Sequence, residues 1–223
     1  MLVIFDCDGT LVDTEIIWAK ASLEIFKEED LDMDLEAYNS TYAGMTNAEI
    51  IQLIEEDIER SLPHDILQRI TDRATSKLDK LKVIEGAHEM LDQLEYPRCV
   101  CSNTAMERLE SNMRLVDLWD RFRPYVYSAV EVGTKLPKPD PNVFLHAATV
   151  LETDPSECFV IEDSTHGVQA ACQAGMRVIG FIGASHSYLG HGEHLMDAGA
   201  ETVVRRLADL PATIDALKDW HEQ

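Results

Sequence analysis

Short apolar segments alternate with helical patterns along most of the chain. Residues 2–5 are apolar with no polar alternation, as expected of a strand buried on both faces of a sheet. Similar segments follow at residues 98–101, 125–129, 158–161, 177–182 and 202–204. The helical pattern between them covers residues 87–94, 104–115, 141–151, 164–174 and 207–220. Strands that alternate with helices predict a parallel sheet with helices on both faces.

The alternation is interrupted between residues 15 and 82, where only helical patterns occur. Residues 16–28 are amphipathic, Thr46 and Glu49 form a capping-box pattern that opens a second helix, and residues 66–81 carry a third apolar stripe. Thr104 and Glu107 form the same capping pattern at the start of the helix 104–115. We therefore expect an α/β fold in which a Rossmann-like core (residues 1–14 and 83–223) carries an inserted all-helical cap (residues 15–82).

The chain is strongly acidic. It has 223 residues, with 19 Lys and Arg against 41 Asp and Glu, and a net charge of −22. Its hydrophobic content of 45% is typical of a globular protein, so the charge does not indicate disorder. A field of this sign repels nucleic acids and anionic membranes, and we expect neither as a partner. It would also oppose an anionic substrate unless the site compensates for it.

The five cysteines give no sign of a metal or disulfide framework. Their number is odd, their spacing is irregular, and they form no C-x-x-C pair. We expect them to be reduced and mostly in the core, as in a cytoplasmic protein. The sequence shows no signal peptide and no apolar segment of the roughly 20 residues that a membrane helix needs.

Polar side chains gather where the predicted strands end. In an open parallel sheet, ligands bind at the carboxyl ends of the strands. The residues that the chain supplies there are Asp6, Asp8, Ser102, Asn103, Glu162 and Asp163, with Lys138 in a proline-rich turn. Each pair alone is typical of a surface turn or a helix start. Together, the carboxylates suit a hard cation such as Mg²⁺, and the lysine, hydroxyl and amide suit a phosphoryl group.

These segments resemble the motifs of a known family. Phe5-Asp6-Cys7-Asp8-Gly9-Thr10-Leu11-Val12-Asp13-Thr14 is similar to the first motif of the haloacid dehalogenase (HAD) superfamily in its phosphatase form. Ser102-Asn103, Lys138-Pro139-Asp140-Pro141 and Ile161-Glu162-Asp163-Ser164 with Gly167 resemble the second, third and fourth motifs, in that order. The helical insertion falls where this family has its C1-type cap domain.

The resemblance implies roles for these residues. Asp6 would be the nucleophile that forms an aspartyl phosphate, and Asp8 the general acid and base. Mg²⁺ would be held by Asp6, the backbone carbonyl of Asp8 and Asp163, with Glu162 as a further ligand or as a partner of the ligands. Ser102, Asn103 and Lys138 would hold the phosphoryl oxygens, and Lys138 would also offset the repulsion between carboxylates.

Three positions bear on which reaction of the family to expect. Asp8 argues against a dehalogenase, because displacing a halide needs no proton donor. β-Phosphoglucomutases carry a histidine in the first cap helix and an arginine in a Gly-x-Ser-Arg cap segment. The matching residues here are Trp18 and Asn47, the latter in Gly44-Met45-Thr46-Asn47. Both differences favour a phosphatase over a phosphomutase, which stays the alternative, together with a non-catalytic or phosphoryl-storing module on this scaffold.

The cap would recognise the leaving group. The residues that we expect at this surface are Glu15, Trp18, Tyr42, Thr46 and Asn47, although packing in the cap core is the simpler role for Trp18 and Tyr42. The layout resembles bacterial phosphatases of sugar and sugar-acid phosphates, 6-phosphogluconate among them. We therefore expect a small phosphorylated metabolite as the substrate, and a monomer or weak dimer.

A histidine cluster lies outside these motifs. His186, His191 and His194 lie close together in the sequence with Gly190 and Gly192. Their spacing matches no tight helical pair of metal ligands, so we expect a surface loop here rather than a second metal site.

Overall fold

The computed structural model describes residues 1–42 and 45–221. In these residues, six strands form one parallel sheet in the order β3-β2-β1-β4-β5-β6. The strands are β1 (Leu2–Phe5), β2 (Arg98–Ser102), β3 (Val126–Ser128), β4 (Cys158–Glu162), β5 (Arg177–Phe181) and β6 (Thr202–Val204). Each coincides with a predicted apolar segment, which confirms the α/β fold.

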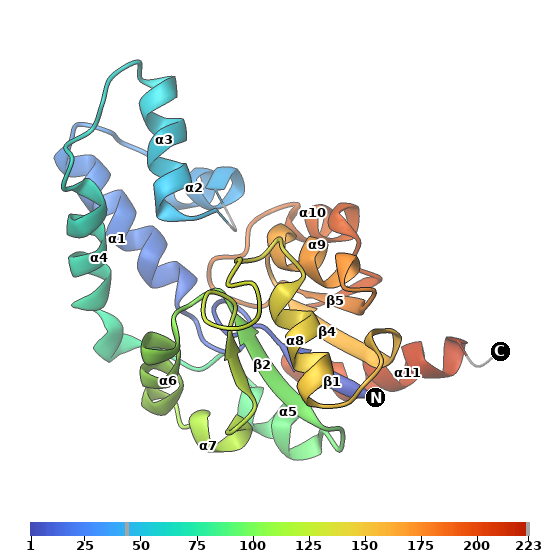
Figure 1. Ribbon diagram of the computed structural model, residues 1–223. Coiled ribbons are helices and arrows are strands. Elements are labelled where there is room, and N and C mark those ends of the chain that lie inside the picture. The colour runs from blue at the N-terminus through green and yellow to red at the C-terminus, as the bar shows by residue number, and fades with distance from the viewer. Residues whose placement is uncertain (43–44, 222–223) are drawn as a thin grey trace.

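Helices cover both faces of the sheet (Figure 1). One face carries α5 (Ala87–Gln93), α6 (Met106–Leu115), α7 (Trp119–Phe122) and α11 (Leu210–His221), and the other carries α8 (Asn142–Val150), α9 (Thr165–Gln173) and α10 (His191–Ala198). Short 3-10 turns at Leu78–Lys80, Pro155–Glu157 and Leu207–Asp209 connect the elements. Alternate residues of β1 enter different cores: Val3 and Phe5 pack with α5, and Leu2 and Ile4 pack with α8.

The helices between β1 and α5 form a group with its own apolar core. The four-helix unit consists of α1 (Glu15–Glu28), α2 (Leu35–Tyr42), α3 (Asn47–Asp57) and α4 (Ile66–Thr75). Phe26, Tyr38, Ile54 and Ile70 belong to an apolar cluster confined to this unit. Figure 1 shows the unit standing clear of the sheet, in blue and teal, beyond the end of the strands. The boundaries of a cap domain at residues 15–82 stay a prediction.

Two of the predicted local patterns were wrong. Thr104 does not cap α6, which begins at Met106 after Ala105 with no side-chain cap. Its hydroxyl donates to Asp8 Oδ2 at 2.9 Å instead, because a carboxylate distant in sequence competes for it. The apolar stripe 66–81 is not one helix, since α4 ends at Thr75. The capping box of Thr46 and Glu49 at the start of α3 is confirmed.

The predicted surface loop around the histidine cluster was also wrong. His186 and His191 are 5% and 2% exposed, and His191 begins α10. Both pack beside Asp163, at the end of β4, and Tyr188 stacks on His191 with ring centroids 4.7 Å apart. The fold brings these side chains to a buried partner that local sequence does not reveal.

The cysteines, all of which the structure describes, form no disulfide bond. Cys7, Cys99, Cys101 and Cys158 are buried, Cys172 is exposed, and all five are free, which confirms a mostly buried set of thiols. Among the described residues, no helix combines the length and the apolar character that crossing a bilayer requires.

Candidate active site

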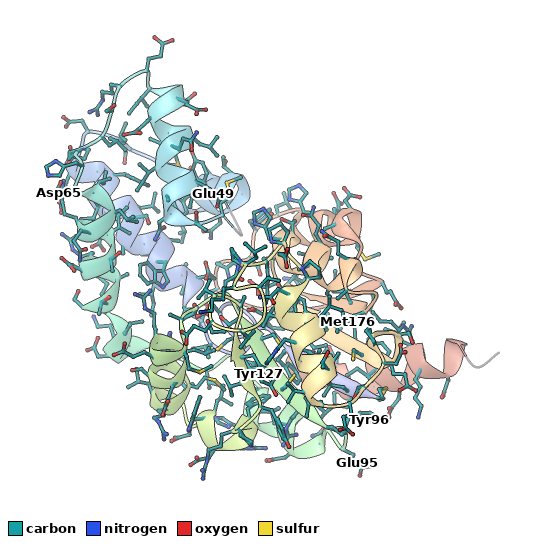
Figure 2. All side chains as sticks on the ribbon, in the orientation of Figure 1. Glu49, Asp65, Glu95, Tyr96, Tyr127 and Met176 are labelled. Carbon is teal, nitrogen blue, oxygen red and sulfur yellow. The ribbon has the colours of Figure 1, made fainter. Side chains whose placement is uncertain are left out.

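The predicted site residues meet at one edge of the sheet. Asp6 directly follows β1, while Ser102 and Glu162 are the last residues of β2 and β4. Since β1 lies between β2 and β4, the three carboxyl ends are adjacent, and the Asp6 N–H donates to Ile161 O at 2.9 Å. Figure 2 labels Tyr96, which precedes β2, at the end of the sheet away from the four-helix unit. The site therefore lies at the end nearer that unit.

Lys138 connects two carboxylates at the centre of the site. It lies in the turn before α8, is 6% exposed, and its ammonium donates to Asp6 Oδ1 at 2.6 Å, Glu162 Oε1 at 2.7 Å and Cys101 O at 2.8 Å. Burial lowers the pKa of Lys138, but Asp6 and Glu162 more than offset this, so its pKa is raised. Asn103 Oδ1 accepts from the Lys138 N–H at 2.8 Å and so fixes the backbone of the turn.

Asp8 is held by hydroxyl groups. Its Oδ1 accepts from Thr14 at 2.7 Å, and its Oδ2 accepts from Ser102 at 3.0 Å and from Thr104 at 2.9 Å. Sequence patterns did not indicate this role for Thr14 and Thr104. The position of Thr104 two residues after Ser102 was a usable signal, but its apparent capping box suggested a local role.

Both carboxylate oxygens and the backbone carbonyl of Asp163 have hydrogen-bonding partners. Its Oδ1 accepts from Thr10 at 2.8 Å, its Oδ2 lies 3.0 Å from His186 Nε2, and its carbonyl lies 2.7 Å from His191 Nε2. Burial raises the pKa of Asp163, yet hydrogen bonds and charge from His186, with Thr10, lower it below its ordinary value. His186 follows β5, so applying the carboxyl-end rule to the fifth strand as well would have found it.

Glu162 is almost completely enclosed. It is 1% exposed, one oxygen accepts from Lys138, and the other accepts from the backbone N–H and the hydroxyl of Ser164 at 3.0 and 2.9 Å. A Cβ at Gly167 would overlap this carboxylate, which explains the glycine. The structure therefore places Glu162 against Lys138 and Ser164.

The site contains more buried negative charge than its own cations balance. Burial raises the pKa of Asp6, Lys138 opposes this, and the charges of Glu162, Asp163 and Asp8 raise it further. A divalent cation would relieve the repulsion. No three His, Cys, Asp or Glu side chains of the described residues form a metal cluster by themselves. The donor set nevertheless fits Mg²⁺, which binds through one or two carboxylates, with water and substrate phosphate completing its shell.

One cavity joins these residues to the four-helix unit. It has a volume of about 200 Å³, and the residues of the catalytic edge that line it are Asp6, Asp8, Ser102, Asn103, Lys138, Glu162 and Asp163. The cap residues predicted from the sequence line it too, namely Glu15, Trp18, Tyr42, Thr46 and Asn47. Tyr38, Asn39 and His186 are further lining residues. Gly44 of the predicted recognition segment lies outside the described residues.

Trp18 and Tyr42 combine the two roles considered for them. Tyr42 is part of the apolar cluster of the four-helix unit, and Trp18 packs against that cluster. Both also line the cavity, and the Arg108 guanidinium lies 5.1 Å from the Trp18 ring centroid. The aromatic residues thus support the cavity wall from behind while presenting part of their surface to it.

Comparison with known proteins agrees with this geometry. The model of the haloacid dehalogenase-like hydrolase family matches residues 3–181. The 6-phosphogluconate phosphatase of Escherichia coli (strain K12) is 29% identical over 83% of this chain and 84% of its own length. The β-phosphoglucomutase of Bacillus subtilis (strain 168) is also 29% identical, over 99% of this chain and 95% of its own. The structure of a haloacid dehalogenase-like protein from Agrobacterium tumefaciens str. C58 superimposes with a TM-score of 0.94, at 41% identity over 97% of this chain and 98% of its own. The chain therefore belongs to the haloacid dehalogenase-like hydrolase family.

Proposed function

We propose that the protein hydrolyses phosphate monoesters of small metabolites, with Asp6 as the nucleophile. The observation that carries this proposal is the paired arrangement of Asp6 and Asp8 in one cavity: Lys138 binds the first, and three hydroxyl groups hold the second. The 6-phosphogluconate phosphatase relative supports the same reaction class.

The two aspartates have complementary roles. An Asp6 oxygen attacks phosphorus while the bond to the ester oxygen breaks, and Asp8 donates a proton to the departing alcohol. Asp8 then takes a proton from the water that hydrolyses the aspartyl phosphate, so each turnover consumes one water. Thr14, Ser102 and Thr104 fix the Asp8 carboxylate at the cavity for both proton transfers.

The phosphoryl group would be held by donors at the strand ends. Among the described residues, the backbone N–H groups of Cys7 and Asp8 have no hydrogen-bond acceptor, so they are available for phosphoryl oxygens. Ser102 and Asn103 line the same cavity. Lys138 supplies positive charge to Asp6, and Glu162 positions Lys138 through the 2.7 Å ion pair.

Mg²⁺ is the cofactor that this donor set favours. Asp6, the backbone carbonyl of Asp8 and Asp163 would hold it, with Glu162 acting indirectly through its ion pair with Lys138. Bound there, the cation would neutralise charge on the transferring phosphoryl group.

Phosphate release with Mg²⁺ tests the proposal. We expect steady release of inorganic phosphate from p-nitrophenyl phosphate and from glucose 6-phosphate, and its loss in Asp6→Asn, whose fold is checked by circular dichroism. Conversion of β-glucose 1-phosphate to glucose 6-phosphate without net phosphate release would instead establish a mutase. Acetyl phosphate that leaves a stable phosphoprotein without turnover would establish a phosphoryl store. Undiminished hydrolysis by Asp6→Asn would contradict the assignment of the nucleophile.

A further inference from the structure

The four-helix unit forms the part of the cavity wall that would face the leaving group, and this part contains one acidic side chain and no basic one among the described residues. Beyond the aspartates, the side chains that the four-helix unit contributes to the wall are aromatic, apolar or neutral polar, apart from one acid, Glu15. The aromatic and neutral polar residues are Trp18, Tyr38, Asn39, Tyr42, Thr46 and Asn47. Hydroxyl, amide and ring groups of this kind bind sugars and polyols through hydrogen bonds and apolar contact.

Neither basic side chain of the cavity is free to pair with a second anion on the leaving group. In the described residues, the basic side chains that line it are Lys138 and His186. Lys138 pairs with Asp6 and Glu162, and His186 Nε2 lies 3.0 Å from Asp163 Oδ2. Both are therefore already balanced by carboxylates of the catalytic edge.

The basic residues of the four-helix unit are directed elsewhere. Arg69, Arg73 and Lys77 form ion pairs with glutamates of α1, and Arg69 also pairs with Glu29, which follows α1. None of the lysines and arginines in the described residues 15–82 lines the cavity. Residues 43 and 44, which are not described, are alanine and glycine and carry no charge. Arg108 contacts the Trp18 ring from α6 but does not line the cavity.

A helix N-terminus can also bind an anion, and the N-terminus of α3 at this wall is capped by its own side chains. Thr46 and Asn47 lie at the start of α3, where Glu49 Oε2 accepts from the Thr46 N–H at 2.7 Å and from its hydroxyl at 2.8 Å. Figure 2 labels Glu49 at the end of α3 that lies toward the core. The Glu49 carboxylate therefore already places a negative charge at this N-terminus, which opposes a substrate carboxylate there.

Glu15 also disfavours binding of a leaving group that carries a negative charge. Burial, opposed by His186 and reinforced by Asp8 and Asp163, raises its pKa to about 8. When protonated, Glu15 can donate a hydrogen bond to a substrate hydroxyl, and when ionised it repels a second negative charge. Neither form compensates for a carboxylate on the leaving group.

We propose that this wall selects phosphate esters of uncharged alcohols, such as sugars or polyols, and rejects esters that carry a carboxylate or a second phosphate. The inference rests on the phosphatase function proposed above and specifies the substrate class of the same site. Rejection follows because an anionic leaving group would lose its hydration without gaining a cationic partner.

A matched set of six-carbon esters tests the inference. We would measure kcat/KM with Mg²⁺ for glucose 6-phosphate, sorbitol 6-phosphate, glucosamine 6-phosphate and 6-phosphogluconate, with p-nitrophenyl phosphate as a reference. We expect kcat/KM for glucose 6-phosphate and sorbitol 6-phosphate, whose alcohol parts are uncharged, to exceed that for 6-phosphogluconate by about tenfold or more. We expect the aminosugar, whose extra charge is positive, to match glucose 6-phosphate within about threefold, because repulsion by negative charge does not act on it.

The possible failures are distinguishable. Equal or faster hydrolysis of 6-phosphogluconate would overturn the charge selection and leave the phosphatase function intact. Equal rejection of glucosamine 6-phosphate and 6-phosphogluconate would show that size or shape decides, which also overturns it. No hydrolysis of any ester, p-nitrophenyl phosphate included, would overturn both proposals.

A variant of the wall gives a second test. Asn47→Lys adds a cation, and we expect it to raise the ratio of kcat/KM for 6-phosphogluconate to that for sorbitol 6-phosphate by about tenfold. Asn47→Gln, which keeps an amide, should change this ratio less than about twofold. Because both esters are measured on one preparation, partial unfolding cancels from the ratio. An unchanged ratio in Asn47→Lys would contradict the inference.

Discussion

The ammonium of Lys138 lies 2.6 Å from Asp6 Oδ1, and the two residues are 132 positions apart in the chain. Glu162 and the carbonyl of Cys101 accept the other hydrogen bonds of this ammonium. A buried cation with all its donors engaged holds the proposed nucleophile in a defined orientation. It also offsets part of the negative charge at the sheet edge, which would otherwise add to the net charge of −22 in opposing an anionic substrate.

Replacing this cation should destabilise the protein. Lys138→Met leaves Asp6 and Glu162 buried without a partner, and we expect a loss of about 3–5 kcal/mol of unfolding free energy, with loss of phosphate release. Urea denaturation in EDTA measures the first, because no metal then replaces the lysine. Adding Glu162→Gln to Lys138→Met should recover part of the stability but no activity. A change below about 1 kcal/mol in Lys138→Met would show that the carboxylates are not held by this cation.

Thr104 should matter to turnover more than to stability. Thr104→Val removes one of the hydroxyl groups that hold Asp8, and we expect kcat to fall about tenfold because the proton donor is less well oriented. KM and the melting temperature should change little. Thr104→Ser keeps the hydroxyl and should retain most of the activity. A fall in kcat of equal size in both variants would mean that the hydroxyl does not act through Asp8.

Gly9 is required by geometry as well as by backbone conformation. Its φ is +85°, and a Cβ would overlap Asp163 Oδ2 and lie 2.8 Å from His186 Cε1. Gly190 is a matched control, with φ +86° and no atom within 4 Å of its Cβ position. We expect Gly190→Ala to cost about 1 kcal/mol from backbone strain, and Gly9→Ala to cost at least about 2 kcal/mol more and to impair activity. Chemical denaturation of both variants measures the difference, and equal costs would refute the role of the close contacts.

Glu15 should make the metal-free protein less stable as the pH rises. Its pKa in the folded protein is about 8, against an ordinary value of 4.5, so between these values the folded state keeps a proton that the unfolded state has released. This contribution to stability is complete below pH 4.5 and declines up to pH 8. The change in unfolding free energy caused by Glu15→Gln should therefore be more stabilising at pH 8 than at pH 4.5, by at least about 1 kcal/mol. This minimum allows for the partial exposure of the Glu15 side chain. Urea denaturation in EDTA across this range measures the change, and a difference independent of pH would contradict the shifted pKa.

Metal dependence has a readout that does not require turnover. EDTA should abolish phosphate release, and Mg²⁺ should restore it. Mg²⁺ should also raise the melting temperature, since a ligand of the folded state stabilises it. Asp163→Asn should reduce this increase strongly. Asp13→Asn is the control, because Asp13 accepts hydrogen bonds from Ser185 rather than lying among the proposed ligands, and it should keep the increase. Equal increases in the two variants would rule out Asp163 as a ligand.

The fold was predictable where short-range patterns determine it. The apolar segment before Asp6 has to be a buried strand, and the topology then places Asp6, Ser102 and Glu162 at adjacent strand ends. For Glu49 and Thr46, the capping box is formed by residues three positions apart, so the sequence sufficed. Thr104 and Glu107 have the same spacing, yet Asp8 takes the threonine hydroxyl, and Glu131 Oε1 accepts from the backbone N–H of Met106 at 2.7 Å.

The amino-acid sequence by itself determined the α/β architecture, the helical insertion and the family motifs, because strand periodicity and short motifs depend on neighbouring residues. Only the tertiary structure decided which partners these residues have. It buried His186 and His191 against Asp163 and placed both oxygens of Glu162 in hydrogen bonds. It also paired Lys138 and His186, the basic side chains that line the cavity in the described residues, with carboxylates. These relationships join residues far apart in the chain, where burial strengthens electrostatic interactions and unpaired charges are costly, so they follow from packing rather than from local pattern.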